Sequence, residues 1–320
     1  MMMKTNRRNF IRKSFIAVIG SLLFGSGFVK TSNGKNFNPV KTIFKPDPLS
    51  WKDDEINIAW VGHATILINF YGKIILTDPV FFERVGLYFL GMTFGPNRYT
   101  LPALSIEEIP KLDLVLISHA HMDHMDYATL LELTEMFPNQ LDCITAYNTA
   151  DVIAELEWRS LKELDWEEEI GLDWIRIKAL EVKHFGWRYP WEKDRSKGYM
   201  EDGRSFNAYI LERNGKKILF GGDTAITEKF RNYGSENVDV AIMPIGAYNP
   251  WRHNHCNPEE ALVMAEYYLN AKYFIPIHCY TFKQGNEPIE EPLNWLRESR
   301  HNYKLTVGLN NIGETFTLKA

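Results

Sequence analysis

Residues 118–126 read SHAHMDHMD, and this stretch carries the strongest information about the fold and the chemistry of the chain. Three histidines and one aspartate lie within six of its residues: His119, His121, Asp123 and His124. A continuous apolar run at 112–117 precedes the stretch and is typical of a strand buried on both faces. Asp126 is a suitable N-cap for a helix that follows. A loop of this composition between a buried strand and a capped helix predicts a metal site rather than a run of surface histidines.

The ligand types in this loop restrict the choice of metal. Imidazole and carboxylate together suit zinc, manganese, iron or nickel better than calcium or magnesium. Four ligands on one tight loop can point in two directions, so two divalent ions fit the pattern.

Outward from the loop, other short apolar runs also end at ligand-type side chains. Strands are expected at 73–77, 175–184, 217–220 and 273–277, and they end at or just before Asp78, His184, Asp223 and His278. Gly221 and Gly222, which precede Asp223, allow close approach of the backbone. Because the carboxyl ends of these strands would form one rim, we expect these side chains to lie near the 118–126 loop.

The strands are predicted both as hairpins and in alternation with helices. Runs at 56–61, 64–70 and 73–77 favour a meander, and Asn214-Gly215 between the runs 206–211 and 217–220 is a strong hairpin signal. Asn257 followed by Pro258 predicts one helix start, and residues 288–300 predict a terminal helix. This mixture predicts layered α/β architecture with mixed sheets in one domain over residues 51–320.

Composition excludes several classes of protein. The chain has 320 residues, of which 45% are hydrophobic and 24% charged, as in an ordinary globular protein. A net charge of −5 gives no footprint for nucleic-acid binding. A chain of this length buries a large core without staples, so its three cysteines need not form disulfides.

The N-terminus differs from the rest of the chain. Residues 1–35 contain seven Lys or Arg and no Asp or Glu, whereas the remainder has 29 basic and 41 acidic residues. Arg7-Arg8 followed by the uncharged run 14–29 resembles a bacterial twin-arginine export signal, either cleaved or retained as a membrane anchor. The alternative is a core or interfacial helix. We expect residues 36–50 to be a linker and the protein to be periplasmic or anchored facing the periplasm.

The ligand pattern resembles that of the metallo-β-lactamase-fold hydrolases, whose signature is His-x-His-x-Asp-His followed by His, Asp and His on later loops. The resemblance covers residues from about 56 to the C-terminus and implies a four-layer αββα sandwich of two mixed β-sheets. It also implies two metal ions, most simply Zn²⁺. His119, His121 and His184 would hold the first ion, Asp123, His124 and His278 the second, and Asp223 would bridge them. Asp78 matches the family's acidic residue that braces the histidine-rich loop.

Further segments resemble the branch that contains N-acylphosphatidylethanolamine phospholipase D and, more distantly, ascorbate-6-phosphate lactonase. They are WVGHAT at 60–65, TDP at 77–79, GPNR at 95–98, GDT at 222–224, PIGAY at 244–248 and HCNPEEA at 255–261. The resemblance implies a phosphodiesterase acting on phospholipids, with a hydroxide shared by the two ions as the nucleophile. A lactonase or a hydrolase of a small phosphorylated metabolite is the first alternative. A non-enzymatic metal-binding envelope protein is the second.

Four other features have more than one interpretation each. Asp123 could orient the nucleophile as well as ligate, and His63 and His255 are candidates for proton transfer, substrate contact or a structural role. Arg188 would either meet a phosphate oxygen or be solvated. The apolar segment 80–94 would either contact a membrane surface or pack as a lid or subunit interface. The sequence leaves the oligomeric state open.

Overall fold

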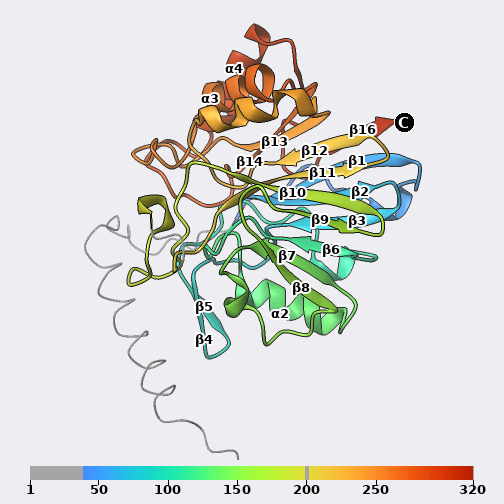
Figure 1. Cartoon of the computed structure of the whole chain (residues 1–320), viewed down its shortest axis with the longest axis vertical. Helices are drawn as coiled ribbons and strands as arrows, with labels where there is room; N and C mark the ends of the chain where they lie inside the picture. Colours follow the sequence, from blue (N-terminus) through green and yellow to red (C-terminus); the bar gives the residue numbers. More distant parts are fainter. Residues whose placement is uncertain (1–38, 199–201, 320) are drawn as a thin grey trace, which may run out of the picture. The chain divides into compact units, whose positions relative to one another are not determined.

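The structure is a computed structural model that describes residues 39–198 and 202–319. Within these residues two seven-stranded sheets stack face to face, and helices cover the two outer faces (Figure 1). Helix α2 lies outside the first sheet, and helices α3 and α4 lie outside the second (Figure 1). The expected αββα sandwich of two mixed sheets is therefore confirmed.

The first sheet has the strand order β16-β1-β2-β3-β6-β7-β8. Strands β16, β1, β2 and β3 pair antiparallel, whereas β3, β6, β7 and β8 pair parallel. Their bounds are β1 Glu55–Gly62, β2 Thr65–Phe70, β3 Lys73–Thr77, β6 Leu114–Leu116, β7 Asp142–Ala146, β8 Ser160–Leu164 and β16 Thr315–Lys319.

The second sheet repeats this plan, with the order β15-β14-β13-β12-β11-β10-β9. Strands β9 to β12 form an antiparallel meander, and β12 to β15 pair parallel. The bounds are β9 Glu169–Leu172, β10 Ile175–Glu181, β11 Asn207–Arg213, β12 Lys216–Phe220, β13 Val240–Pro244, β14 Tyr273–Ile277 and β15 Thr306–Val307. Asn214 and Gly215 both have positive φ in the β11–β12 turn, as the sequence predicted.

Three α-helices belong to the described residues; two begin where the sequence predicts a start, and the third, α4, begins three residues after the expected 288. They are α2 Tyr127–Met136, α3 Pro258–Val263 and α4 Glu291–Ser299. The carboxylate of Asp126 caps α2 by accepting the Thr129 N–H, and Asn257 caps α3 in the same way through Glu260 N–H. The other helical segments are a π turn at Met264–Tyr268 and 3₁₀ segments at Pro48–Ser50, Ile106–Glu108, Ala150–Val152, Arg195–Lys197, Glu228–Glu236 and Arg300–Asn302.

Alternating side chains on the strands divide the core into layers. In β6, Leu114 and Leu116 join the large cluster between the sheets, whereas Val115 packs in the cluster that includes Leu130 and Leu133 of α2. This strand is buried on both faces, as its continuous apolar sequence predicted, although it is shorter than the expected 112–117. One apolar layer packs on each face of the first sheet, and together the two layers hold the carboxyl ends of its strands in place.

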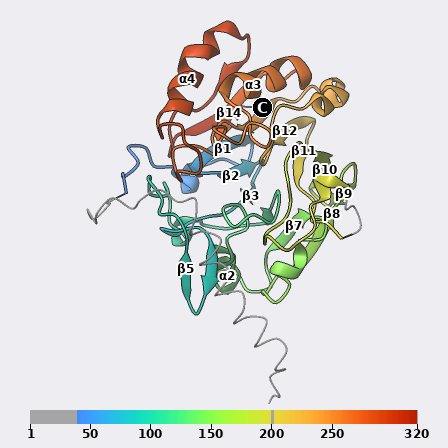
Figure 2. The same cartoon turned by 90° about the vertical axis from the view of Figure 1, so that its left-hand side faces the viewer.

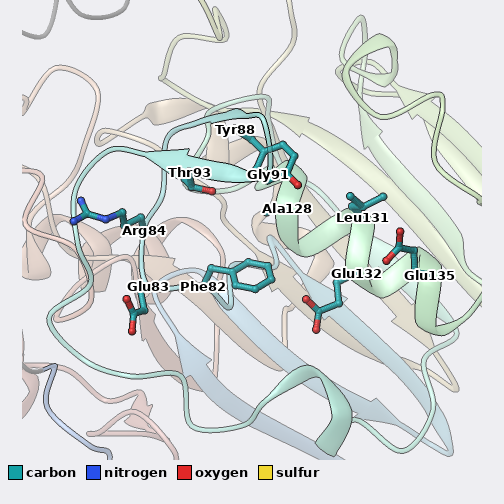
Figure 3. A pocket seen from close by; sticks show the side chains of 10 residues that line it. All are labelled: Phe82, Glu83, Arg84, Tyr88, Gly91, Thr93, Ala128, Leu131, Glu132 and Glu135. Carbon is teal, nitrogen blue, oxygen red and sulfur yellow. The ribbon is translucent and has the colours of Figure 1, made fainter. Parts of the chain in front are cut away.

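The segment 80–94 was expected as a connection but contains a two-stranded hairpin of β4 Leu87–Phe89 and β5 Met92–Phe94. Turned by 90°, the molecule shows β5 beside α2, well away from α3 and α4 (Figure 2). The face of the hairpin that carries Tyr88 and Thr93 covers a cavity of about 490 Å³ above α2 (Figure 3). No turn signal as strong as Asn-Gly occurs in this segment, so periodicity alone did not reveal the two short strands.

The N-terminal predictions lie largely outside the described residues. The export signal or anchor at 1–35 belongs to that part of the chain, as does the start of the expected linker. Within the described residues, Val40 pairs with Thr100 in a parallel bridge, and its N–H donates to the Tyr99 carbonyl at 2.8 Å. No helix in 39–198 or 202–319 combines the length and apolar character needed to cross a bilayer.

Candidate metal centre

The ligand-type side chains meet at the carboxyl ends of strands from both sheets. Asp78 and His278 directly follow β3 and β14, whereas His119, His184 and Asp223 lie three residues after the ends of β6, β10 and β12. A bridge between His119 and Phe206 joins the two sheets at this rim, and Asn207 N–H donates to the Ser118 carbonyl at 2.9 Å. The expectation that one edge gathers these residues is thus correct.

Glycine makes one close approach at the rim. Gly222 has φ +55°, and a Cβ atom built there would lie 2.6 Å from Ser118 Cβ and 2.8 Å from the Asn207 carbonyl oxygen. The absence of a side chain therefore lets the Asp223 segment pass directly against the histidine-rich loop.

Two groups of four side chains each place one ligand atom per residue within 4.8 Å of the others. We call them the first cluster, formed by His119, His121, His184 and Asp223, and the second cluster, formed by His63, Asp123, His124 and His278. Each therefore contains three imidazoles and one carboxylate. All members are buried except His121 and Asp123, which are partly exposed.

Asp223, a member of the first cluster, also faces the second cluster. Its Oδ2 is 3.2 Å from His124 Nε2 and 3.1 Å from His278 Nε2 in the second cluster. The same oxygen is 3.8 Å from His184 Nε2 in the first cluster. One carboxylate therefore faces both groups of imidazoles.

Asp78 contacts two residues of the histidine-rich loop, residues 118–126, and so holds the loop in place. Its Oδ2 is 2.6 Å from His124 Nδ1, and its Oδ1 accepts the Ser118 N–H at 2.7 Å. Ser118 Oγ donates to Asp78 and lies 2.8 Å from His119 Nδ1, so the hydroxyl connects Asp78 to a second imidazole. These contacts fix the rings of one histidine in each cluster.

Comparison with known proteins gives the family. Residues 73–279 match the family described as the β-lactamase superfamily domain, which is more than half of the chain. The chain belongs to the β-lactamase superfamily. The matched range includes every member of the two clusters except His63.

Three individual proteins that are similar to this chain support the assignment. N-acyl-phosphatidylethanolamine-hydrolyzing phospholipase D 1 of Caenorhabditis elegans is 29% identical over 261 residues, which cover 75% of this chain and 68% of that protein. A metal-dependent hydrolase of Bacillus cereus is 28% identical over 71% of this chain and 87% of its own length. The metallo hydrolase Igni18 of Ignicoccus hospitalis has the same fold, with a TM-score of 0.60, 19% identity and coverage of 83% of this chain and 99% of that one.

The imidazoles of this superfamily member differ in charge between the clusters. Burial lowers the pKa of His121 to about 3 and that of His184 to about 4, and it lowers the pKa of His119 well below its usual value. The first cluster therefore presents neutral imidazoles, which are the form that binds a metal.

In the second cluster, burial also lowers the pKa of His63, to about 3, but the pKa values of the other two imidazoles are raised. Burial acts to lower the pKa of His278, but the neighbouring Asp223 and Asp123 outweigh it and raise the pKa to about 9. Burial also opposes the charge on His124, yet Asp223, Asp123 and Asp78 hold its pKa well above the usual value. The same contacts overcome burial and keep the pKa values of Asp123 and Asp223 well below the usual range. Without metal, these groups form a buried network of ion pairs.

Several buried polar atoms of the site lack hydrogen-bond partners among the described residues. They include His121 Nε2, His124 Nε2, Asp223 Oδ1 and His255 Nδ1. Buried unpartnered atoms are costly, and here imidazole nitrogens and a carboxylate oxygen converge on shared space. This donor set fits divalent cations of the zinc, manganese, iron or nickel type.

The remaining candidates lie at different distances from the clusters. His255 is buried, its Nδ1 lies 3.7 Å from Asp223 Oδ2, and its ring stacks on that of His278. Arg188 is also buried, and its Nη1 donates to the Ala120 and Met125 carbonyls at 2.7 and 3.0 Å. It therefore braces the histidine-rich loop from inside the protein, so the expected solvated side chain is wrong, whereas the phosphate contact stays a prediction.

Two neighbours of the clusters were missed in the sequence. Gln284 Nε2 donates to Asp123 Oδ2 at 2.6 Å, and the Asn254 carbonyl lies 3.0 Å from His184 Nδ1. Gln284 follows His278 by six residues, in a loop with no motif of its own, so no local signal pointed to it. The cysteines near the site are free and buried, and Cys256 Sγ lies 3.2 Å from the Pro244 carbonyl.

Proposed function

We propose that this protein is a binuclear metal-dependent phosphodiesterase of the phospholipase D type, with N-acylphosphatidylethanolamine-like phospholipids as substrates. The observation that carries the proposal is the pair of adjacent clusters, each with three imidazoles and a carboxylate, which Asp223 of the first cluster connects by facing the imidazoles of both. The 29% identity to a phospholipase D that hydrolyses N-acyl-phosphatidylethanolamine supports the substrate class.

In this proposal, His119, His121 and His184 hold one ion, Asp123, His124 and His278 hold the other, and Asp223 serves both. Zn²⁺ is the expected metal, and Mn²⁺, Fe²⁺ or Ni²⁺ suit the same ligands. When bound, two such cations lower the pKa of water toward neutrality and stabilise negative charge on a phosphoryl group.

The chain's own residues provide orientation and proton transfer. Asp123 lies at the partly exposed side of the second cluster, so it can orient the attacking water as well as ligate. Burial and the nearby His184 and His278 keep the pKa of His255 well below its usual value, although Asp223 opposes them. A neutral imidazole with an unpartnered Nδ1 is suited to accept a proton or to contact the substrate. Hydrolysis would break the bond between phosphorus and the headgroup oxygen, adding water across it to give phosphatidate and an N-acylethanolamine.

Aromatic side chains beside the first cluster suit an apolar substrate. The ring of Phe185 lies 4.3 Å from that of His121, and Trp187 lies 4.9 Å from Phe185, measured between ring centroids. Both side chains are only partly buried. They form an apolar wall next to the proposed metals, where an acyl chain or glycerol backbone could lie.

The test is hydrolysis by protein loaded with zinc. We expect release of N-acylethanolamine from N-acylphosphatidylethanolamine in mixed micelles, and turnover of bis(p-nitrophenyl) phosphate. Hydrolysis of simple lactones or small phosphate esters without any phosphodiester turnover would contradict the proposal and favour the alternative activities. Near-zero metal content after zinc supplementation would favour the non-enzymatic metal-binding protein instead.

The β4–β5 hairpin supports a lipid substrate, and we propose that it contacts the bilayer surface. Cross-strand pairing places Leu87 beside Phe94 and Phe89 beside Met92, so four apolar side chains share the face opposite Tyr88 and Thr93. Leu90 at the turn is 80% exposed, and Met92 and Phe94 are more than half exposed. By contrast, the base of segment 80–94 is packed, since Val80 and Val85 form a small cluster with Phe282.

Vesicle sedimentation tests this contact. Leu90→Ser/Phe94→Ser should bind phosphatidylcholine vesicles several-fold more weakly than the wild-type protein, with unchanged turnover of bis(p-nitrophenyl) phosphate. Ile43→Ser/Leu49→Ser is a matched control, because Ile43 and Leu49 are as exposed as Leu90 but lie outside the hairpin. Equal binding by all three proteins would remove the hairpin from the proposal.

We also propose export by the twin-arginine route, on the sequence of residues 1–35 alone. Replacing Arg7 and Arg8 by Lys should leave the full-length protein in the cytoplasm of a bacterial host. An unchanged periplasmic or membrane fraction after this substitution would contradict the route.

A further inference from the structure

His63 is the only member of the second cluster that precedes the matched family range 73–279. Its side chain is fully buried, with its ring 4.4 Å from that of His278 and 5.4 Å from that of His124, measured between centroids. Its Nε2 lies 3.0 Å from Asp123 Oδ2. The imidazole therefore faces the atoms proposed to hold the second ion.

The backbone at His63 is in an unfavourable conformation. The residue has φ +50° in the tight turn between β1 and β2, a region in which glycine or asparagine is usual. Its carbonyl accepts from the Trp60 indole at 2.8 Å and from the His278 N–H at 3.0 Å, and its own N–H donates to Thr281 Oγ1. The surroundings thus impose the strain, and strain of this kind is concentrated at functional sites.

Two other residues of the site share this conformation. Asp78 has φ +34° and His278 has φ +58°. His63 therefore belongs, by backbone as well as by side chain, with the residues that build the site.

Asp123 Oδ2 is surrounded by more nitrogen atoms than it can accept hydrogen bonds from. His63 Nε2 is at 3.0 Å, Gln284 Nε2 at 2.6 Å, and the Nε2 atoms of His124 and His278 are both at 3.3 Å. A carboxylate oxygen offers about two lone-pair sites. With one site directed at a cation and the other occupied by the short bond from Gln284, the three imidazoles have no acceptor left and present lone pairs to the same cation.

The distances agree with this arrangement. Ligands on neighbouring corners of a site with metal–ligand bonds of about 2.0–2.2 Å lie about 3.0–3.6 Å apart. The three imidazole nitrogens approach Asp123 Oδ2 to between 3.0 and 3.3 Å.

We propose that His63 is a ligand of the second metal ion, so that the second site has three imidazoles and a carboxylate, like the first. The inference rests on the proposed binuclear site and extends it by one residue. With Asp223 available to both ions, the first site has four protein ligands and the second has five, of which His63 is the additional one.

His63→Gly is the informative variant, because it removes the imidazole and because glycine adopts φ +50° without backbone strain in the turn. Wild-type protein should bind two equivalents of Zn²⁺, whereas the variant should bind the second at least about 100-fold more weakly. The variant without metal should melt no lower than the wild-type protein without metal. Free imidazole, which can occupy the vacated space, should restore the second equivalent.

Gln284→Ala is the matched control, because Gln284 contacts the same Asp123 oxygen by a hydrogen bond. With ¹¹³Cd²⁺ in place of zinc, the control should keep both resonances near their wild-type shifts. His63→Gly should lose one resonance or shift it in the direction of fewer nitrogen ligands.

The outcomes separate the possibilities. Equal loss of the second equivalent in both variants would show that His63 only orients Asp123 and would overturn the inference. Full retention of two equivalents by His63→Gly would also overturn it, while leaving the binuclear hydrolase intact. Wild-type protein that binds no metal would overturn the proposed function and the inference together.

Discussion

The first and second clusters contain the same kinds of side chain in different electrostatic surroundings. The first cluster has one carboxylate among its three imidazoles, and burial keeps those imidazoles neutral. In the second cluster, Asp123, Asp223 and Asp78 surround His124 and His278 and hold their protons in place. Identical ligand types therefore do not give equal sites. The first is ready for a metal, whereas the second must first release protons that stabilise it without one.

Removing the shared carboxylate should have the largest effect, because it is the one group that contacts the imidazoles of both clusters. Asp223→Ala takes away the one group that faces both, and we expect loss of both metal equivalents and a fall in phosphodiesterase activity of about 10⁴-fold. Elemental analysis and turnover of bis(p-nitrophenyl) phosphate measure the two losses. A variant with full activity would show that the ligand assignment is wrong.

The clusters should also respond differently to pH. His121 and His184, with pKa values of about 3 and 4, are neutral throughout pH 6–8, so metal affinity of the first cluster should hardly change in that range. His278, with a pKa of about 9, is protonated there, so affinity of the second cluster should fall about tenfold per pH unit for each proton displaced, which is about 100-fold from pH 8 to 6 for the His278 proton alone.

Calorimetry in two buffers of different ionisation enthalpy measures those protons. The tighter equivalent should release almost none at pH 7.5, and the weaker one at least one. The metal-free protein carries the opposite dependence: the folded-state pKa of His278 is raised above the ordinary 6.5, so its contribution to stability is complete below pH 6.5 and is lost as the pH rises through 9. Equal proton release for both equivalents would remove the proposed difference between the clusters.

The sequence predicted much of this site because its ligands follow strands with strong local patterns. The strand 273–277 agrees with β14 at both ends, and Asp126 caps α2 as expected. Strand β16 was not predicted, because it is defined by pairing with β1 across some 260 residues, which no local pattern records. Gln284 was missed for the same reason, since its partner Asp123 is 161 residues away. Long-range hydrogen bonds, rather than propensities, decide such features.

Asp78 offers a smaller and more selective perturbation. It contacts His124 of the second cluster directly, but reaches His119 of the first only through Ser118. Asp78→Asn should therefore weaken metal binding at the second cluster about 10–100-fold and at the first by less. Competition with a chromophoric chelator gives both affinities. A larger loss of metal affinity at the tighter site would show that Asp78 supports the first cluster more than the second.

Arg188→Met should have the smallest effect on the difference between the clusters, although it should lower stability. Arg188 holds the carbonyls of Ala120 and Met125, and the ligands that the loop supplies to both clusters lie between or beside these two points. Leaving two buried carbonyls unpartnered should cost about 2–4 kcal/mol of unfolding free energy, and both metal affinities should fall by a similar few-fold factor.

Arg159→Met is the matched control, because its ion pair with Asp142 is exposed and should contribute less than about 1 kcal/mol. Urea unfolding of the metal-free proteins and chelator competition of the loaded ones measure the two effects. If the metal affinity of only one cluster fell, the two halves of the loop would be positioned independently of each other. The difference between the clusters would then depend on how the loop is packed as well as on electrostatics.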